Sequence, residues 1–377
     1  GTGTAEEMSD WVEYCNLENE GKYAKWRIAN GEEQPYNVKY WSIGNENYGN
    51  WEIGAKSSEE WWRLVKESAK MIKHVSPTVE LSAAALPDID WTMNLLKHCG
   101  EYLDWISLHG YWDMLAEKNE LADYTQCMAY TEQVDRAVTD VKGLLTALHL
   151  EKKIKIAFDE WNLRGWHHPN VHTIKQGIDK DSYLIPRDKN DDNSSYTMAD
   201  AVFTACFLNA MNRNCDIVGM ANFAPILNTR GCIYSYKDGV VLRSTYHVFD
   251  LYVNHMGDTV LDSWEEGEKN TFTVLDKNGR KVTVNTLDIL ATQHSETEKI
   301  SIAVVNKEPD KEKKLEICLD ENSYARYEVQ EYRIVGSSVD SYNDIDRTEV
   351  FIEQLLTKET SGVYQVKLAP HSINVID

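Results

Sequence analysis

The sequence contains no stretch of about 18 consecutive apolar residues, so no membrane-spanning helix is predicted. Basic residues are also scarce: 39 Lys and Arg stand against 61 Asp and Glu, which gives a formal net charge of -22. Because contacts with phosphate groups need patches of Lys and Arg, this deficit argues against nucleic acid and anionic membranes as partners. The charge balance is compatible with a neutral substrate.

The seven cysteines show neither a disulfide framework nor a zinc-binding pattern. Their number is odd, they are scattered, and no C-x-x-C pair occurs. This usage favours free thiols in a reducing compartment, so we expect a cytoplasmic protein. No signal peptide is visible, although the chain does not begin with methionine.

Glycine-rich phosphate loops are missing as well. The chain has no G-x-G-x-x-G after a predicted strand and no Walker motif. Their absence argues against a nucleotide-binding fold.

Strand-like apolar runs alternate with helical stretches through the first 256 residues. The predicted strands are 38–44, 79–86, 103–108, 154–158 and 217–224, and the predicted helices include 57–75, 130–150, 197–214 and 244–255. Strand alternating with helix predicts a parallel sheet, either an open doubly wound sheet or part of an eight-stranded barrel. Polar residues at the strand ends favour the (β/α)8 TIM barrel, which keeps its chemistry there.

The pattern changes near Gly257. Short alternating runs separated by turn residues, such as "KVTVNTL" and "VYQVKL", predict an all-β sandwich. We therefore expect a catalytic barrel domain over residues 1–256 and a β-sandwich domain over residues 257–377.

Three predicted strands end in residues that carry chemistry. "WSIGNEN" supplies Asn45 and Glu46, "WISLHGYW" supplies His109 and Tyr111, and "IAFDEWN" supplies Glu160. Because the carboxyl ends of parallel barrel strands meet at one rim, Glu46 and Glu160 are expected to face each other there.

Two opposed carboxyl groups are what glycoside hydrolysis requires. One group protonates the leaving oxygen, and the other attacks the anomeric carbon or activates water. A separation of about 5–5.5 Å predicts retention of configuration, and about 6.5–9.5 Å predicts inversion.

Other side chains near these strand ends suit a sugar ligand. Asn45 is expected to bind a sugar hydroxyl, and His109 and Tyr111 to supply neutral donors beside the nucleophile. Trp51 and Trp161 are expected to form flat apolar walls.

Less specific interpretations compete with several of these assignments. A glutamate at a strand end is often a cap or an ion-pair partner, and His109 and Tyr111 are compatible with core positions. Asp159 alternates to the opposite face from Glu160, so we expect it in a structural ion pair. A zinc interpretation of H-H-x-x-x-H lacks supporting carboxylates, which favours loop structure or substrate contact and no metal; the histidines are His167, His168 and His172.

Counting strands gives a further expectation. A barrel of this kind closes on eight strands, and only five are predicted before the sandwich. If three strands precede Gly1, Glu46 and Glu160 fall on strands four and seven.

Several segments in this order resemble the α-L-arabinofuranosidases of glycoside hydrolase family 51. They are "GTGTAEEMSDWVEYCN", "VKYWSIGNENYGNWEIG", "DWISLHGYW", "IAFDEWN", "MANFAPILNTRG" and "LRSTYHVFDLY". The resemblance covers the whole chain. It implies a retaining enzyme with Glu46 as acid/base and Glu160 as nucleophile, and no metal or organic cofactor.

The resemblance also implies roles for residues around the two glutamates. It implies that Asn45 contacts the sugar 2-hydroxyl and that His109 and Tyr111 position the nucleophile. We also place Trp161 and Asn228 among the substrate-binding residues. The expected partner is an arabinose-containing oligosaccharide, and the expected assembly is a homo-oligomer, either a trimer or a hexamer.

Two departures from the family pattern are expected to affect substrate preference. Pro225 stands where the family often has Gln, and Arg164 stands where many relatives have Trp. The remaining alternatives are another two-glutamate barrel glycosidase, such as a β-glucanase or β-xylosidase, and a non-catalytic carbohydrate-binding protein.

Overall fold

The computed structural model describes residues 2–113, 121–165, 191–267, 270–276, 279–319, 326–355 and 357–377. Contacts divide the chain into two compact units. The first comprises residues 1–109, 136–160 and 216–222, and the second comprises residues 110–135, 161–215 and 223–377. Each unit is described by itself.

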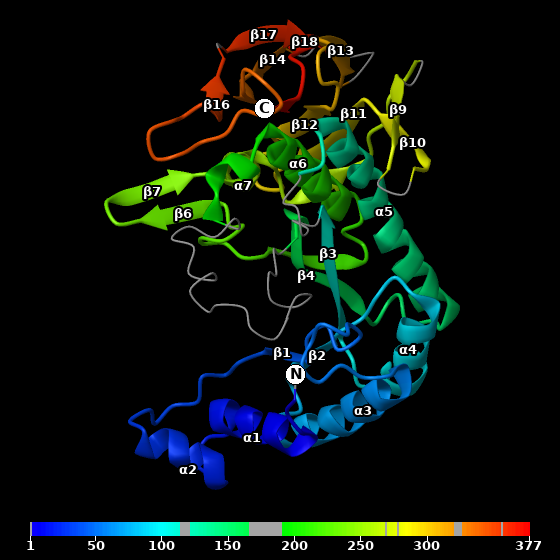
Figure 1. The fold of residues 1–377 in the computed structure, drawn as a ribbon, viewed down its shortest axis with the longest axis vertical. Helices are drawn as coiled ribbons and strands as arrows, with labels where there is room; N and C mark the ends of the chain where they lie inside the picture. Colours follow the sequence, from blue (N-terminus) through cyan, green and yellow to red (C-terminus); the bar gives the residue numbers. More distant parts are fainter. Residues whose placement is uncertain are drawn as a thin grey trace, which may run out of the picture. The chain divides into compact units, whose positions relative to one another are not determined.

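The first unit contains a parallel pair of strands connected by one long helix, with further helices before and after the pair in the chain (Figure 1). β1 (Tyr40–Ile43) pairs with β2 (Glu80–Ala83), and Ile43 lies opposite Ala83. α1 (Ala5–Asn16) packs on α3 (Ser58–Val75), and the other helical segments are α2 (Lys22–Ala29), η1 (Ile89–Met93) and α4 (Asn94–Cys99). Ser57 and Glu60 form a capping box that fixes the start of α3.

The next three strands form one sheet in the order β3-β4-β5. They are β3 (Trp105–Asp113), β4 (Lys155–Arg164) and β5 (Val218–Phe223), with α5 (Tyr124–Ala147) between β3 and β4. A parallel bridge between Ala84 and Ser107 joins the end of β2 to β3. All five strands expected from the sequence are present.

β3 and β4 are longer than predicted. The sequence placed their ends at Leu108 and Phe158, where the apolar runs stop, but both strands continue through the polar residues that follow. His109 and Glu160, which were expected at the strand ends, therefore lie within the strands. Backbone pairing continues there because it does not depend on apolar side chains.

The second unit contains the β-sandwich. Its six-stranded sheet has the order β16-β15-β19-β12-β11-β8 and its four-stranded sheet has the order β13-β18-β17-β14. The strands of the larger sheet are β8 (Thr259–Leu261), β11 (Leu287–Gln293), β12 (Ile300–Asn306), β15 (Glu331–Val335), β16 (Phe351–Gln354) and β19 (Ser372–Ile376). Those of the smaller are β13 (Lys313–Cys318), β14 (Arg326–Val329), β17 (Lys358–Ser361) and β18 (Val363–Leu368).

Helices and two hairpins complete the second unit. α6 (Met198–Arg213) and α7 (Ser244–His255) pack on strands of the larger sheet. The hairpins are β6 (Ile233–Tyr236) with β7 (Gly239–Leu242), and β9 (Thr271–Leu275) with β10 (Lys281–Asn285). The 3-10 turn η4 (Asn193–Ser195) precedes α6. The division between the two units does not follow the expected boundary at residue 257, which stays a prediction.

Candidate active site

The turn after β1 requires glycine at its first position. Gly44 has φ +73°, a conformation that residues with a side chain rarely adopt. A Cβ atom there would lie 2.2 Å from Asn47 Oδ1 and 2.3 Å from the ring of Trp61. Glycine at this position therefore lets the backbone pass between these two side chains.

Asn47 holds the loop that follows. It is fully buried, its Oδ1 accepts the backbone N–H of Asn45 at 3.0 Å, and its Nδ2 donates to the carbonyl of Gly54 at 3.1 Å. Glu46, between the two asparagines, has φ +44°. Strained backbone of this kind is concentrated at functional sites. The polar Gly-Asn-Glu-Asn sequence thus builds a turn that presents a glutamate.

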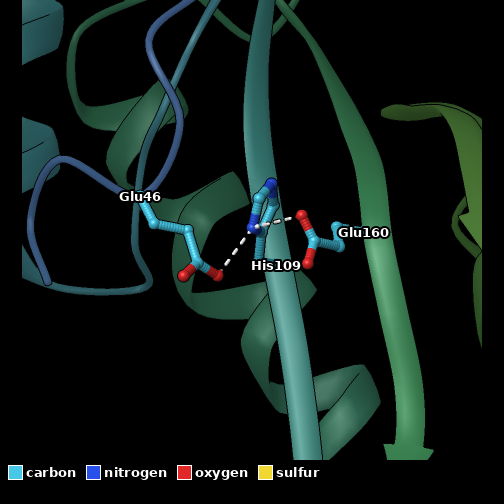
Figure 2. Close-up of side chains that lie close together, drawn as sticks. All are labelled: Glu46, His109 and Glu160. Carbon is cyan, nitrogen blue, oxygen red and sulfur yellow. Dashed lines mark hydrogen bonds and ion pairs between the residues drawn. The ribbon is translucent and has the colours of Figure 1, made fainter. Parts of the chain in front are cut away.

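Glu46 and Glu160 approach the same nitrogen of His109. Nδ1 of His109 lies 2.8 Å from Glu46 Oε1 and 3.3 Å from Glu160 Oε2. Figure 2 shows the imidazole on β3 between the two carboxylates, with Glu46 on its loop and Glu160 on β4. Trp51 Nε1 donates to the other oxygen of Glu46, Oε2, at 2.6 Å.

The two carboxylates are close enough for a shared reaction centre. One oxygen of Glu46, one oxygen of Glu160 and one nitrogen of His109 all lie within 4.8 Å of one another. This spacing fits the short separation of retaining glycosidases better than the wider one of inverting enzymes.

Nε2, the other nitrogen of His109, faces Asp159. It lies 3.5 Å from Asp159 Oδ1, which also accepts the hydroxyl of Ser107 at 2.8 Å. Burial opposes the charged imidazolium, but the hydrogen bond to Glu46 and the charges of Glu160 and Asp159 outweigh it, so the pKa of His109 is raised. Burial likewise raises the pKa of Asp159.

Tyr48 belongs to the same site, although the sequence analysis gave it no role. Burial, and then the charge of Glu46, raise the pKa of its hydroxyl well above the ordinary value. Its ring makes edge contacts with Trp51 and Trp91, with centroids 6.3 and 5.8 Å apart. Its place two residues after Glu46 was the only sequence signal available.

The same cluster has the composition of a cation site, because a histidine and two glutamates converge. A carboxylate pair around a histidine serves acid/base chemistry equally well, and we assign no metal here. The histidines considered for zinc, His167, His168 and His172, lie outside the described residues.

Comparison with known proteins identifies the family. The sequence profile of the α-L-arabinofuranosidase C-terminal domain matches residues 159–372, and that of the α-L-arabinofuranosidase 1 domain matches residues 2–129. The chain belongs to the α-L-arabinofuranosidases.

Individual relatives of the chain support the same family. The chain is 29% identical to the intracellular exo-α-(1→5)-L-arabinofuranosidase 1 of Bacillus subtilis, covering 100% of this chain and 73% of that protein. It is similar to the crystal structure of α-L-arabinofuranosidase from Thermotoga maritima in an arabinose complex, with TM-score 0.85, 29% identity and coverage of 100% and 73%. The GH51 α-L-arabinofuranosidase of Thermotoga petrophila gives TM-score 0.81, 28% identity and the same coverage.

These likenesses place the arabinofuranosidase in glycoside hydrolase family 51 and confirm the predicted fold class, a TIM barrel followed by a β-sandwich. They also make the chain a glycoside hydrolase. Within the described residues, no helix is long and apolar enough to cross a membrane.

Tyr111, two residues beyond His109 on β3, is paired with a cation in the second unit of the arabinofuranosidase. Arg230 Nη2 donates to the Tyr111 hydroxyl at 2.9 Å, and the guanidinium lies 4.3 Å from the centre of the ring. Arg230 is buried. No pattern in the sequence indicated a role for Arg230, because its partner Tyr111 is 119 residues away in the chain.

Trp161 does not offer a wall to a ligand in this structure. Its side chain has no exposed surface. It stacks on Phe207 at 3.6 Å between ring centres and makes an edge contact with Phe223 at 5.0 Å. The predicted sugar-binding role therefore does not fit its burial, whereas Trp51 is 51% exposed and keeps an open face.

Asn228 uses its side chain within its own turn. It has φ +54°, and its Oδ1 accepts the backbone N–H of Ser235 at 2.8 Å. The side chain of Asn45, by contrast, is exposed beside Glu46. Substrate contacts by Asn45 and Asn228 remain predictions.

Arg164 is structural rather than part of a binding surface. It is 1% exposed; its Nε and Nη2 donate to the two oxygens of Asp200 at 3.0 Å each, and its Nη1 donates to Asp113. This burial leaves Arg164 no surface for direct contact with a sugar, and an effect of this position on substrate preference stays a prediction. A buried guanidinium needs such partners because an unpaired charge inside a protein is costly.

Proposed function

We propose that this chain removes terminal α-L-arabinofuranosyl groups by double displacement with retention of configuration. The supporting observation is the approach of Glu46 and Glu160 to within 4.8 Å around one histidine. The family resemblance assigns Glu160 as the nucleophile and Glu46 as the acid/base.

In the first step, a carboxylate oxygen of Glu160 attacks the anomeric carbon. The bond to the leaving oxygen breaks while Glu46 delivers a proton to that oxygen, and a covalent arabinosyl-enzyme results. In the second step, Glu46 removes a proton from water, the water oxygen attacks the anomeric carbon and Glu160 leaves.

The residues around the glutamates suit this cycle. Nδ1 of His109 is able to donate to either carboxylate when it carries a proton and to accept from Glu46 when it does not. Trp51 donates to Glu46 and leaves half of its ring exposed beside the carboxylate. We place Asn45 on the sugar hydroxyl next to the reacting carbon.

For the substrate, we propose arabino-oligosaccharides with α-(1→5) linkages, attacked from the non-reducing end. Relatives named exo-α-(1→5)-L-arabinofuranosidases support this choice, and the acidic chain is compatible with a neutral sugar. Both of these relatives are named as intracellular enzymes, which supports a cytoplasmic location for this chain. Assembly as a homotrimer or homohexamer, without nucleic acid or membrane partners, is part of the same proposal.

Kinetics on substrates with different leaving groups distinguish the roles of the two glutamates. Glu160→Gln is expected to lower kcat by about 10⁴-fold or more on every arabinoside, because no nucleophile remains. Glu46→Ala is expected to lose about 10²–10⁴-fold on arabinobiose but little in the first step on a nitrophenyl arabinoside, whose leaving group needs no proton.

Two outcomes would contradict the assignment. Equal losses on both substrates in Glu46→Ala would remove its role as acid, and turnover by Glu160→Gln would remove the nucleophile. Turnover of β-glucosides or β-xylosides in preference to arabinosides would instead favour another barrel glycosidase.

A further inference from the structure

Asp159 is a carboxylate beside the reaction centre that the double displacement does not use. It precedes Glu160 on β4, and its side chain is only 26% exposed. The sequence analysis expected it in a structural ion pair on the opposite face of the strand. In the structure its Oδ1 faces Nε2 of His109, at 3.5 Å.

The position of Asp159 is fixed from the neighbouring strand. Its Oδ1 accepts the hydroxyl of Ser107, which is 3% exposed. Ser107 and His109 are two residues apart on β3, so their side chains lie on the same face. Ser107 is itself held by the parallel bridge to Ala84 and by the backbone N–H of Ala85, which donates to its carbonyl at 2.9 Å.

The imidazole of His109 therefore lies between carboxylates at both nitrogens. Nδ1 faces Glu46 and Glu160, while Nε2 faces Asp159. A neutral imidazole carries one N–H, and the partner of one nitrogen decides whether the other is a donor or an acceptor.

We propose that Asp159 is a positioning residue that keeps a proton on Nε2 of His109. Nδ1 is then free to change from hydrogen-bond acceptor to donor when Glu46 loses its proton. This inference rests on the proposed function, because it assumes that Glu46 donates a proton in the first step and recovers one in the second. When Glu46 is protonated, Nδ1 accepts its hydrogen bond. When Glu46 has given its proton to the leaving oxygen, Nδ1 takes a proton from solvent and donates it in a hydrogen bond to the Glu46 carboxylate; it returns this proton to solvent when Glu46 is protonated again by the attacking water.

Asp159→Asn tests this at nearly constant shape. The amide keeps the size of the side chain but lacks the anion that holds the Nε2 proton. We expect kcat on arabinobiose to fall by about 10–100-fold with KM nearly unchanged. Ser107→Ala should lose less, and Asp159→Glu should recover part of the activity. Asp90→Asn, at an exposed aspartate of the same unit, is the matched control with activity unchanged.

Two further readouts distinguish positioning from a merely structural role. Nitrogen-15 NMR of His109 should show Nε2 protonated in the wild type and a shift toward Nδ1 protonation in Asp159→Asn. In a His109→Gln background, Asp159→Asn should cause no additional loss of kcat, because the residue acts through the imidazole.

Several results would overturn the proposal. They are wild-type kcat in folded Asp159→Asn, an unchanged NMR pattern of His109, or an equal loss with and without His109. The NMR result does not depend on turnover, so failure of the glutamate assignments and failure of the Asp159 assignment are distinguishable.

Discussion

Glu46 and Glu160 reach the same imidazole nitrogen from two different kinds of backbone. Glu46 sits at positive φ in a loop after a four-residue strand, held by the hydrogen bonds of Asn47. Glu160 lies inside a ten-residue strand whose next residues, beginning with Trp161, are buried. One carboxylate depends on a few local contacts, and the other on a continuous element.

This difference predicts different responses to substitution. Changes in the loop should reduce activity with a small effect on the free energy of unfolding. Changes along β4 should mainly reduce the free energy of unfolding.

Arg164→Met should be the most destabilising change on β4. It leaves Asp113 and Asp200 buried without their cation, which should lower the free energy of unfolding by about 3–5 kcal/mol. Denaturant unfolding measures the loss. Arg164→Lys keeps the charge but not the planar fork, so a smaller loss is expected. An unchanged unfolding midpoint in Arg164→Met would contradict a structural role for this residue.

Gly44→Ala should affect activity more than stability. The added methyl group collides with Asn47 and the ring of Trp61, so the loop must shift and Glu46 moves with it. We expect kcat/KM to fall about 10²-fold, because misplacement by about 1 Å has that effect. Gly143→Ala is the matched control: nothing lies within 4 Å of its Cβ position in α5, and it should be neutral or slightly stabilising.

The stabilising effect of His109 should depend on pH. Its pKa is raised in the folded protein, so its contribution is fully present below about pH 6.5 and is lost as the pH rises through the folded value. The difference in free energy of unfolding between wild type and His109→Gln should therefore be larger near pH 5.5 than near pH 9.

The same experiment compares the two glutamates. Glu46→Gln should weaken this pH dependence more than Glu160→Gln, because Glu46 makes the shorter contact with the imidazole, 2.8 against 3.3 Å. If Glu160→Gln weakened the pH dependence more, Glu160 rather than Glu46 would make the larger contribution to the raised pKa of His109.

Trp51→Phe should have the smallest effect. It removes the N–H that donates to Glu46 and keeps an aromatic face, so a loss of about 3–10-fold in kcat/KM is expected, equivalent to one ordinary hydrogen bond of about 1 kcal/mol. Steady-state kinetics on arabinobiose measure it. Trp51→Ala should lose more, because the ring is removed as well; equal losses would assign the whole effect to the N–H.

Sequence reasoning predicted the parts of this molecule that periodicity and spacing encode. The five strands, the helix expected over residues 57–75 and the pairing of Glu46 with Glu160 followed from apolar runs and from polar residues at their ends. The continuation of β3 and β4 past those runs did not, because backbone hydrogen bonds extend a strand without an apolar signal.

Residues whose surroundings come from distant segments were harder to predict. Trp161 looked like a sugar platform because it follows the nucleophile, but Phe207 and Phe223 cover it. Arg164 looked like a change in the binding surface, yet its partners lie on other elements. Asp159 was assigned by strand alternation, which cannot show that the histidine of the neighbouring strand reaches it.

The central claim is that Glu160 forms a covalent bond to the sugar while Glu46 assists. Mass spectrometry of the Glu46→Ala variant, quenched during turnover of a nitrophenyl arabinofuranoside, tests it most directly. The account predicts one added pentosyl group on the peptide that contains Glu160. A covalent adduct on any other peptide, or inversion at the anomeric carbon of the first product seen by NMR, would contradict it.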